Sequence, residues 1–309
     1  MTEYLPEGEL SQLPSNALHT ANLTALEDIM KKGIIAEGIC TLCDSNHNLI
    51  VNLGFAQGFI PRNEGAIGID NGTTRDIALI SRVNKPVCFI VTEIKATSDG
   101  KYKIILSRKK AQEKCIENYI SKLKNGDIID AKITHLESFG AFVDIGCGIP
   151  SLIPIDLISV SRISHPSDRF IVGQNIKAVV KSTDDNKITL THKELLGSWQ
   201  ENANLYSIGE TVTGIVRSVE NYGIFVELTP NLAGLAEIKD GVETGNMVSV
   251  YIKAIIPDKM KVKLIIVDKF NTQKNLKPLP YQYFINEKHM DSWVYSTNHC
   301  FKSIRTDFT

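Results

Sequence analysis

The sequence has no hydrophobic run long enough for a membrane helix, and its first residues lack the features of a secretion signal. No apolar run among the 309 residues approaches the roughly 18 residues that a membrane-spanning helix requires. Residues 1–29 carry five acidic side chains and no Lys or Arg, whereas a secretion signal begins with basic residues before an apolar stretch. We therefore expect a cytoplasmic protein without a membrane partner.

The chain also lacks a strong excess of charge. Its 34 Lys and Arg balance 35 Asp and Glu, which excludes a histone-like or tail-driven nucleic-acid binder. The balance is uneven, because residues 30–115 carry 13 basic and 8 acidic side chains whereas residues 196–268 carry 6 and 9. A nucleic-acid site in the later part would therefore depend on stacking more than on phosphate neutralisation, and its salt dependence would be shallow.

The cysteines do not form a disulfide framework. Six of them are spread over the whole length, and we expect reduced thiols that are mostly buried: Cys40, Cys43, Cys88, Cys115, Cys147 and Cys300. Cys40 and Cys43 with His47 have a spacing similar to that of zinc ligands. Zinc needs four converging ligands, however, and no second cysteine pair follows, so we expect no metal.

Motifs for chemistry are missing as well. The glycine-rich stretch 140–148 lacks the Lys-Ser/Thr ending of a phosphate-binding loop. No Ser or Cys nucleophile is paired by sequence with His135, His165 or His192, which we interpret as polar surface residues. The sequence therefore predicts no catalytic residues, no cofactor and no enzymatic activity.

Internal repetition is the most informative feature that the sequence does have. Residues 126–145 match residues 209–228 at a constant offset of 83 without a gap. Both segments share a Gly followed by an acid, the same aliphatic positions, an aromatic-Gly pair and a second aromatic three residues after the first. A fainter third copy begins at Gly33 and ends near Gly54. A fixed period of this kind indicates repeated structural modules.

Each repeat predicts a five-stranded β-barrel. Its segments are short, rich in β-branched residues, roughly alternating and separated by Gly, Asn and Asp. The fold class is therefore all-β, with three consecutive barrels joined by short helical linkers and followed by an aromatic-rich C-terminal segment. The expected order is a flexible acidic segment (1–29), a divergent first barrel (30–112), a helical linker (113–124), a second barrel (125–193), a helical linker (194–206), a third barrel (207–268) and a C-terminal segment packed on the third barrel (269–309).

The repeated aromatic residues are the candidate binding site. Residues three apart on a regular strand point to opposite faces, so Phe139 and Phe142 share a face only if Gly140 permits a bulge or kink. Tyr222 and Phe225 repeat the arrangement. Two exposed rings on a barrel form a stacking platform for unpaired bases, and their repetition beside a Gly argues against a purely structural role.

These segments resemble the ribosomal protein S-one (S1) motif, an OB-fold module that binds RNA. The resemblance covers roughly residues 30–268 and is most specific in the second and third repeats. It implies that Phe139, Phe142, Tyr222 and Phe225 stack on bases. Lys187 and Lys261 stand where the family usually has Arg before the fifth strand, and they are expected to contact phosphates.

The sequence departs from the family pattern at several positions. The RNA-contacting His of the family is Pro154 in the second repeat and Glu237 in the third, which removes a donor and in the third adds a carboxylate. In the first repeat Ile50 and His47 take the two aromatic positions, so we expect no stacking platform there. Because the leading repeats of the ribosomal family dock on the small subunit, a docking role for the first barrel is a further expectation.

The resemblance implies a single-stranded RNA-binding protein that acts in translation and captures mRNA at the small ribosomal subunit. We expect a monomer with RNA, and with the small ribosomal subunit, as partners. Two alternatives stay open at this point. One is an accessory protein or enzyme of RNA processing or decay, and the other is a protein-interaction scaffold whose barrels have lost RNA binding.

Overall fold

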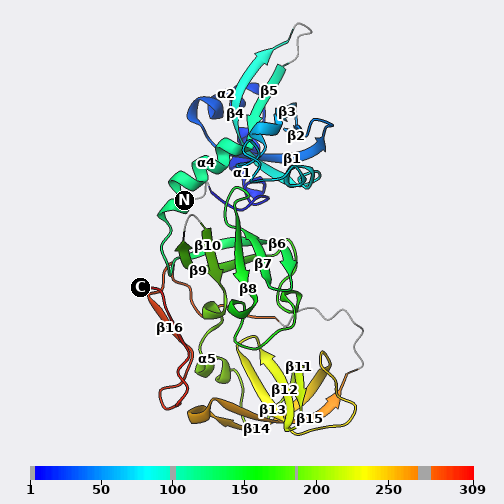
Figure 1. The fold of residues 1–309 in the computed structure, drawn as a ribbon, viewed down its shortest axis with the longest axis vertical. Helices are drawn as coiled ribbons and strands as arrows, with labels where there is room; N and C mark the ends of the chain where they lie inside the picture. Colours follow the sequence, from blue (N-terminus) through cyan, green and yellow to red (C-terminus); the bar gives the residue numbers. More distant parts are fainter. Residues whose placement is uncertain (1–3, 98–101, 185–186, 271–279) are drawn as a thin grey trace. The chain divides into compact units, whose positions relative to one another are not determined.

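The structure is a computed structural model that describes residues 4–97, 102–184, 187–270 and 280–309. Its contacts divide the chain into two compact units, Met1–Leu123 with Asp144–Pro150, and Lys124–Val143 with Ser151–Thr309. The first unit holds one barrel, and the second holds the third barrel and most of the second (Figure 1).

The first barrel is closed by five strands in the order β1-β2-β3-β5-β4. Only the β3–β5 pair is parallel, with Phe59 opposite Ile105. Leu49, Val51 and Leu106 are fully or almost fully buried in its core. The strands are β1 (Ala36–Cys43), β2 (Leu49–Asn52), β3 (Gln57–Ile60), β4 (Pro86–Ala96) and β5 (Tyr102–Ser107).

The second and third barrels have the same strand order, β10-β8-β7-β6-β9 and β11-β12-β13-β15-β14. Ile129, Ala131 and Ile133 of β6 are buried at every second position, as a strand with one face on a core requires. Three closed five-stranded barrels confirm the predicted all-β fold. Their strands are β6 (Ile128–Glu137), β7 (Gly140–Asp144), β8 (Pro150–Pro154), β9 (Asn175–Asp184), β10 (Lys187–Thr191), β11 (Thr211–Glu220), β12 (Gly223–Thr229), β13 (Leu232–Ala236), β14 (Met247–Ile256) and β15 (Lys261–Lys269).

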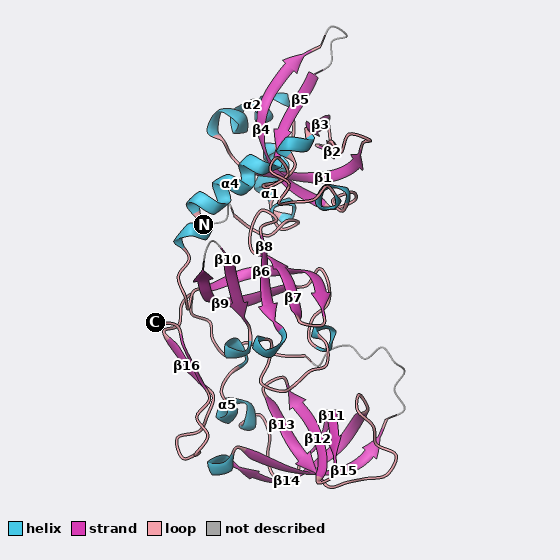
Figure 2. Cartoon of the chain, in the orientation of Figure 1, coloured by secondary structure: helices cyan, strands magenta, loops and turns pink. Residues whose placement is uncertain are grey.

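Helices join the barrels, as Figure 2 shows. The first linker helix, α4 (Arg108–Asn118), begins five residues earlier than the predicted linker because the Ser107 hydroxyl caps it by accepting from the Lys110 N–H (2.9 Å). The second linker consists of η6 (Lys193–Leu196) and α5 (Trp199–Ala203). The first linker also contains η3 (Ile120–Lys122), and the short helical turns in the barrels are η2 (Arg62–Glu64), α3 (Ile77–Ile80), η4 (Ile155–Leu157), η5 (Pro166–Asp168) and η7 (Pro257–Lys259). Among the described residues no helix is both long and apolar enough to cross a membrane.

The N-terminal segment differs from the flexible stretch that its acidity predicts over residues 1–29. It forms η1 (Leu10–Gln12), α1 (Pro14–His19) and α2 (Leu23–Lys32). The Asn16 side chain bonds both the N–H and the C=O of Glu37 in β1 (2.8 and 3.0 Å). The Glu37 carboxylate in turn accepts from the Gly8 N–H (2.6 Å). Glu37, a buried acid of β1, therefore holds this segment in place, a contact that average composition does not reveal.

The described part of the C-terminal segment, 280–309, has a wider contact surface than the predicted packing on the third barrel. It contains β16 (Ser292–Val294) and β17 (Arg305–Asp307) and runs beside the second barrel and α5 (Figure 1). The Lys177 N–H of β9 donates to the Tyr283 hydroxyl (2.9 Å), and the Tyr295 hydroxyl donates to the Asn231 carbonyl before β13 (2.6 Å). The segment therefore contacts both barrels of its unit.

One residue expected on the surface, His192, lies at the centre of this contact. Its ring is fully buried, with Phe170, Tyr281 and Tyr283 edge-on to it at centroid distances of 5.0–5.6 Å. Burial lowers the pKa of His192 to about 4, so the imidazole is neutral at physiological pH. The aromatic residues of the C-terminal segment therefore enclose a buried, uncharged histidine.

Candidate nucleic-acid interface

Both predicted aromatic pairs form ring contacts on the barrel surface. Phe139 and Phe142 lie with centroids 5.9 Å apart and planes at 89°, and Tyr222 and Phe225 lie 6.1 Å apart at 87°. The first ring of each pair is well exposed, at 54% for Phe139 and 70% for Tyr222. The second ring is half-buried. Each pair therefore presents one open ring face braced by a second ring.

The structure gives a different reason for this pairing than the predicted bulge at Gly140. Phe139 and Tyr222 lie in the turns before β7 and β12, so strand alternation does not apply to them. The ladder irregularity nearest Tyr222 lies on the neighbouring strand β11, between Val216 and Ser218.

The two glycines leave room for the next strand, which passes close to each of them. A Cβ on Gly140 would meet the Ile153 carbonyl oxygen at 2.5 Å, and a Cβ on Gly223 would meet that of Ala236 at 2.7 Å. Glycine therefore lets the adjoining strand pass immediately beside each ring pair.

The two predicted lysines differ in how clearly they belong to a site. Lys261 lines a groove of about 540 Å³ together with Tyr222 and Phe225. Lys253 and Lys263, which the sequence did not single out, line it as well. Lys187 is exposed at the start of β10, cross-strand from Asp184. The structure thus brings Lys261 together with its ring pair, whereas Lys187 lies opposite Asp184 at the start of its strand.

Two residues near the ring pairs, His135 in the second barrel and Glu237 in the third, modify the expected site. His135, expected to be an ordinary surface residue, lies 6.4 Å from Phe142 with the ring planes only 30° apart, which makes it a third ring of the second barrel. Ser218 holds the corresponding position of the third barrel, opposite Phe225. Glu237 lines the groove of the third barrel, with its carboxylate 3.8 Å from the Lys253 ammonium. The ammonium offsets part of the charge that this carboxylate would place near a phosphate.

The first barrel has another arrangement at the same positions. Ile50 pairs with Phe59 of β3, and the Lys103 ammonium lies over the Phe59 ring at 5.7 Å from its centroid. His47 stands in the preceding turn, 3.9 Å from the Asp76 carboxylate. The first barrel therefore has a single ring here, Phe59, which is covered by the Lys103 ammonium, whereas the later barrels present ring pairs.

A buried ion network includes two residues from strands β11 and β12 of the third barrel. Glu227 of β12 is completely buried and accepts from the Arg169 guanidinium (2.5 Å), which is also buried. Arg217 of β11 binds the same carboxylate (2.7 and 3.3 Å) and reaches Asp168 (3.3 Å). Arg169 and Asp168 precede β9 of the second barrel, so the network ties that barrel to the third.

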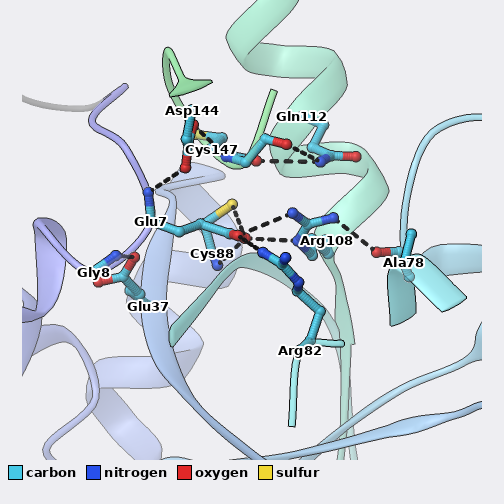
Figure 3. Close-up of polar contacts among 12 residues, drawn as sticks. Glu7, Gly8, Glu37, Ala78, Arg82, Cys88, Arg108, Gln112, Asp144 and Cys147 are labelled. Atoms are coloured by element: carbon cyan, nitrogen blue, oxygen red, sulfur yellow. Dashed lines mark hydrogen bonds and ion pairs between the residues drawn. The ribbon is translucent and has the colours of Figure 1, made fainter. Parts of the chain in front are cut away.

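Figure 3 shows a second buried polar cluster, centred on Glu7 in the first unit. The Glu7 carboxylate binds Arg108 (2.6 Å) and Arg82 (3.0 Å), and these guanidinium groups keep its pKa below the usual value against the effect of burial. Asp144 accepts from the Glu7 backbone N–H (2.7 Å). Burial, with the nearby Glu7 charge, raises the pKa of Asp144 to about 7.

The chemistry of this cluster is structural. The Asp144 oxygens also accept from the N–H groups of Gly146 and Gly148 (2.8 and 3.0 Å), so both are occupied by backbone donors. Cys88 and Cys147 beside it are buried, and burial raises the pKa of the Cys88 thiol. In the part of the chain that the structure describes, no group of three or more His, Cys, Asp and Glu side chains is placed to hold a metal ion.

Comparison with known proteins gives one family match and a set of ribosomal relatives. The model described as "S1 RNA binding domain" matches residues 122–193. The chain is 34% identical over 179 residues to small ribosomal subunit protein bS1 of Chlamydia muridarum, an alignment covering 53% of this chain and 31% of that protein. It is 28% identical over 256 residues to the bS1 of Rhodopseudomonas palustris, covering 77% and 42%.

The chain spans about a third to a half of the length of these curated relatives. Among solved structures it is similar to a multidomain protein with nucleic acid binding domains from Streptococcus pneumoniae, with 12% identity, a TM-score of 0.25 and coverage of 79% and 76%. That similarity is too low to carry an argument. The family match shows that the chain contains an S1 RNA binding domain at residues 122–193, and over a longer stretch the chain is similar to bS1 proteins.

Proposed function

We propose that the chain binds single-stranded RNA through the ring pairs of its second and third barrels and acts in translation, by capturing mRNA at the small ribosomal subunit. The observation that carries the proposal is the repetition of one geometry. Two T-shaped ring pairs stand at the same position of two barrels, each with an exposed ring on which a base can stack. The bS1 relatives, named as proteins of the small ribosomal subunit, support the setting.

In the third barrel the groove supplies both parts of a binding site. Tyr222 and Phe225 offer stacking surfaces, and Lys253, Lys261 and Lys263 offer charges for the backbone phosphates. Few cations take part, so affinity falls only gently with salt. Two barrels joined by a short linker also raise the effective concentration for the second contact, which lets two modest sites hold one strand.

The first barrel has a different task in this proposal. Its ring, Phe59, lies under the Lys103 ammonium, and Ile50 replaces the second ring. We assign it to docking on the small ribosomal subunit and the later barrels to the RNA strand. This division supports a translation factor over a scaffold without RNA binding, because the ring pairs of the later barrels remain open.

The test is a titration of labelled single-stranded RNA, and of single-stranded DNA for comparison, with the full chain. Replacing Phe142 and Phe225 together by Ala should weaken RNA binding by roughly tenfold or more, since a base stack on an aromatic ring contributes about 1–3 kcal/mol. Phe301→Ala, which removes a fully exposed ring outside the barrels, is the matched control and should leave affinity unchanged.

The same double variant tests the docking role. It should still sediment with small ribosomal subunits if the first barrel provides that contact. An unchanged dissociation constant for RNA would refute the stacking assignment of Phe142 and Phe225. Loss of sedimentation together with RNA binding would place both tasks on the ring pairs.

A further inference from the structure

A second groove, on the other side of the Tyr222–Phe225 pair, has no role in the site described so far. It has a volume of about 640 Å³ and lies between the segment Val160–Ser164 with Asp168, which belongs to the second barrel, and strand β11 and the loop at Thr244 and Gly245 of the third. We propose that this groove holds the nucleobase of the nucleotide next to the one stacked on Tyr222 and Phe225, with Arg162 contacting the phosphate at its rim. The proposal rests on the proposed RNA binding and extends it to a subsite shared by two barrels.

The two walls of this groove are held in fixed positions. The buried Arg169–Glu227 pair joins them at 2.5 Å. The Ser161 N–H donates to the Pro230 carbonyl (3.0 Å), and the Val160 N–H donates to the Asn231 side-chain oxygen (3.0 Å). A groove fixed by several bonds is formed before the ligand arrives, so binding costs little ordering of the protein.

The groove is continuous with the ring pair. Tyr222, Phe225 and Ala233 line both this groove and the lysine-lined groove of about 540 Å³. The two rings therefore form the wall between two hollows. A strand whose base stacks on the exposed face of Tyr222 has its neighbouring nucleotide at the entrance of the second hollow.

The charges in the groove favour a neutral group over a phosphate. Arg217 is committed to Glu227 and Asp168, which leaves Asp168 paired, and the exposed Glu220 adds a further negative charge to the lining. Apart from the exposed Arg162, the lining therefore carries one cation, Arg217, and two anions, Asp168 and Glu220, so an anion gains nothing by entering the hollow. A flat, uncharged group with hydrogen-bonding edges suits such a lining, and a nucleobase is such a group.

Arg162 is the exception. It is exposed at the rim and has no ion-pair partner among the residues that the structure describes. A guanidinium with all its donors open recognises a phosphate by two parallel hydrogen bonds. The base inside the groove and the phosphate on Arg162 account for the two chemical parts of one nucleotide.

The experiment measures the affinity of the full chain for labelled oligouridine of about 30 nucleotides, long enough to cross the second and third barrels together at up to about 16 nucleotides each. Thr244→Met fills the groove with a flexible apolar side chain that offers no ring for stacking, and it should weaken binding about threefold to tenfold, the lower part of the range for one base contact. Arg162→Ala should weaken binding by a similar factor and lower the salt slope by about one phosphate contact.

Matched controls keep the outcomes separable. Thr213→Met places the same side chain at an exposed β11 position outside the groove, and Arg75→Ala removes an exposed arginine of the first barrel. Both should bind RNA as the unchanged chain does. Melting curves establish that Thr244→Met is folded, and Arg162→Ala replaces an exposed side chain with no ion pair to lose.

Three results would overturn the inference. If Phe142→Ala with Phe225→Ala weakens binding while Thr244→Met and Arg162→Ala do not, the groove is empty and only the ring pairs bind. If Arg162→Ala weakens binding and Thr244→Met does not, Arg162 contacts a phosphate and no base enters the groove. If the ring variants themselves have no effect, the proposed function fails first.

Discussion

The second and third barrels repeat one sequence pattern at an offset of 83 residues, yet the buried carboxylate at one repeated position has different hydrogen-bond donors in the two barrels. Asp144 ends β7, and Glu227 stands at the corresponding place in β12. Asp144 accepts from three backbone N–H groups, of Glu7, Gly146 and Gly148. Glu227 accepts from two guanidinium groups, of Arg169 and Arg217.

The difference shows what a repeat position specifies. In both copies the position holds an acid that joins its strand to a segment outside the strand's own hairpin: the N-terminal segment for Asp144, and the loop before β9 for Glu227. The partner is free to vary, because either amides or guanidinium groups satisfy carboxylate oxygens. In the copy that faces amides, burial raises the pKa of the acid, Asp144, to about 7.

Of the changes that test this comparison, removing the charge of Glu227 should lower the free energy of unfolding the most. Glu227→Gln leaves two guanidinium groups facing a neutral amide, with Arg169 buried and forming no second ion pair among the described residues. Breaking a buried pair in this way costs about 3–5 kcal/mol of unfolding free energy. Both tryptophans of the chain, Trp199 and Trp293, are buried in the core of this unit, so the denaturant midpoint from tryptophan fluorescence measures its stability.

An exposed pair provides the control for that variant. Asp130→Asn removes the partner of Lys177 in the same unit, where the two side chains are 65% and 48% exposed, and it should change stability by less than about 0.5 kcal/mol. A Glu227→Gln midpoint equal to that of the Asp130→Asn variant would mean that the network contributes nothing to the link between the barrels.

The titration of Asp144 predicts a smaller, pH-dependent effect. Its pKa is raised from 3.8 to about 7, so the folded state holds a proton that the unfolded state releases between about pH 4 and 7. Stability from this group is therefore present below pH 4 and is lost as the pH rises to 7, by at most about 1.4 kcal/mol per pH unit. Asp144→Asn abolishes this slope, because an amide does not titrate in the range.

Hydrogen exchange of peptides covering residues 140–150 measures the effect locally. The ratio of exchange rates in the two proteins cancels the intrinsic pH dependence of exchange and any constant cost of the amide. The protection of the unchanged chain relative to Asp144→Asn should fall from pH 4 to 7 and then stay level. A ratio that is flat over this range would show that Asp144 is ionised throughout.

The sequence predicted the three barrels because their patterning is local: short alternating strands, turn residues and a repeat with a constant offset. It predicted the ring pairs for the same reason, since Phe139 with Phe142 and Tyr222 with Phe225 are close along the chain. The lysines Lys253 and Lys263 escaped notice because only strand register brings them to the groove.

Contacts between distant segments could not be predicted. Glu7 and its partner Arg108 are 101 residues apart in the sequence, and Arg169 and its partner Glu227 are 58 apart. His192 gave no sign of burial, because the rings that enclose it, Tyr281 and Tyr283, lie about 90 residues later in a segment without repeat partners. Such pairings depend on how separately folded elements pack, which no local pattern encodes.

The smallest expected effect compares the third ring of the second barrel with its counterpart in the third. His135 lies nearly parallel to Phe142, whereas Ser218 stands opposite Phe225. His135→Ala removes a ring that braces the stacking face and should weaken RNA binding of the full chain about twofold to fivefold, less than the loss of a directly stacked ring. Ser218→Ala, which removes no ring, should change the affinity by less than about twofold.

Binding of the same labelled RNA to both variants measures this difference directly. Equal affinities for the two variants would show that His135 adds nothing to the second barrel, and that the ring pairs are equivalent despite their neighbours. A larger loss for His135→Ala, which we expect, would make the second barrel the stronger RNA site. That ranking has a physical cause, because the second barrel has an additional ring beside Phe142 and the third has Glu237, a carboxylate that repels phosphate, in its groove.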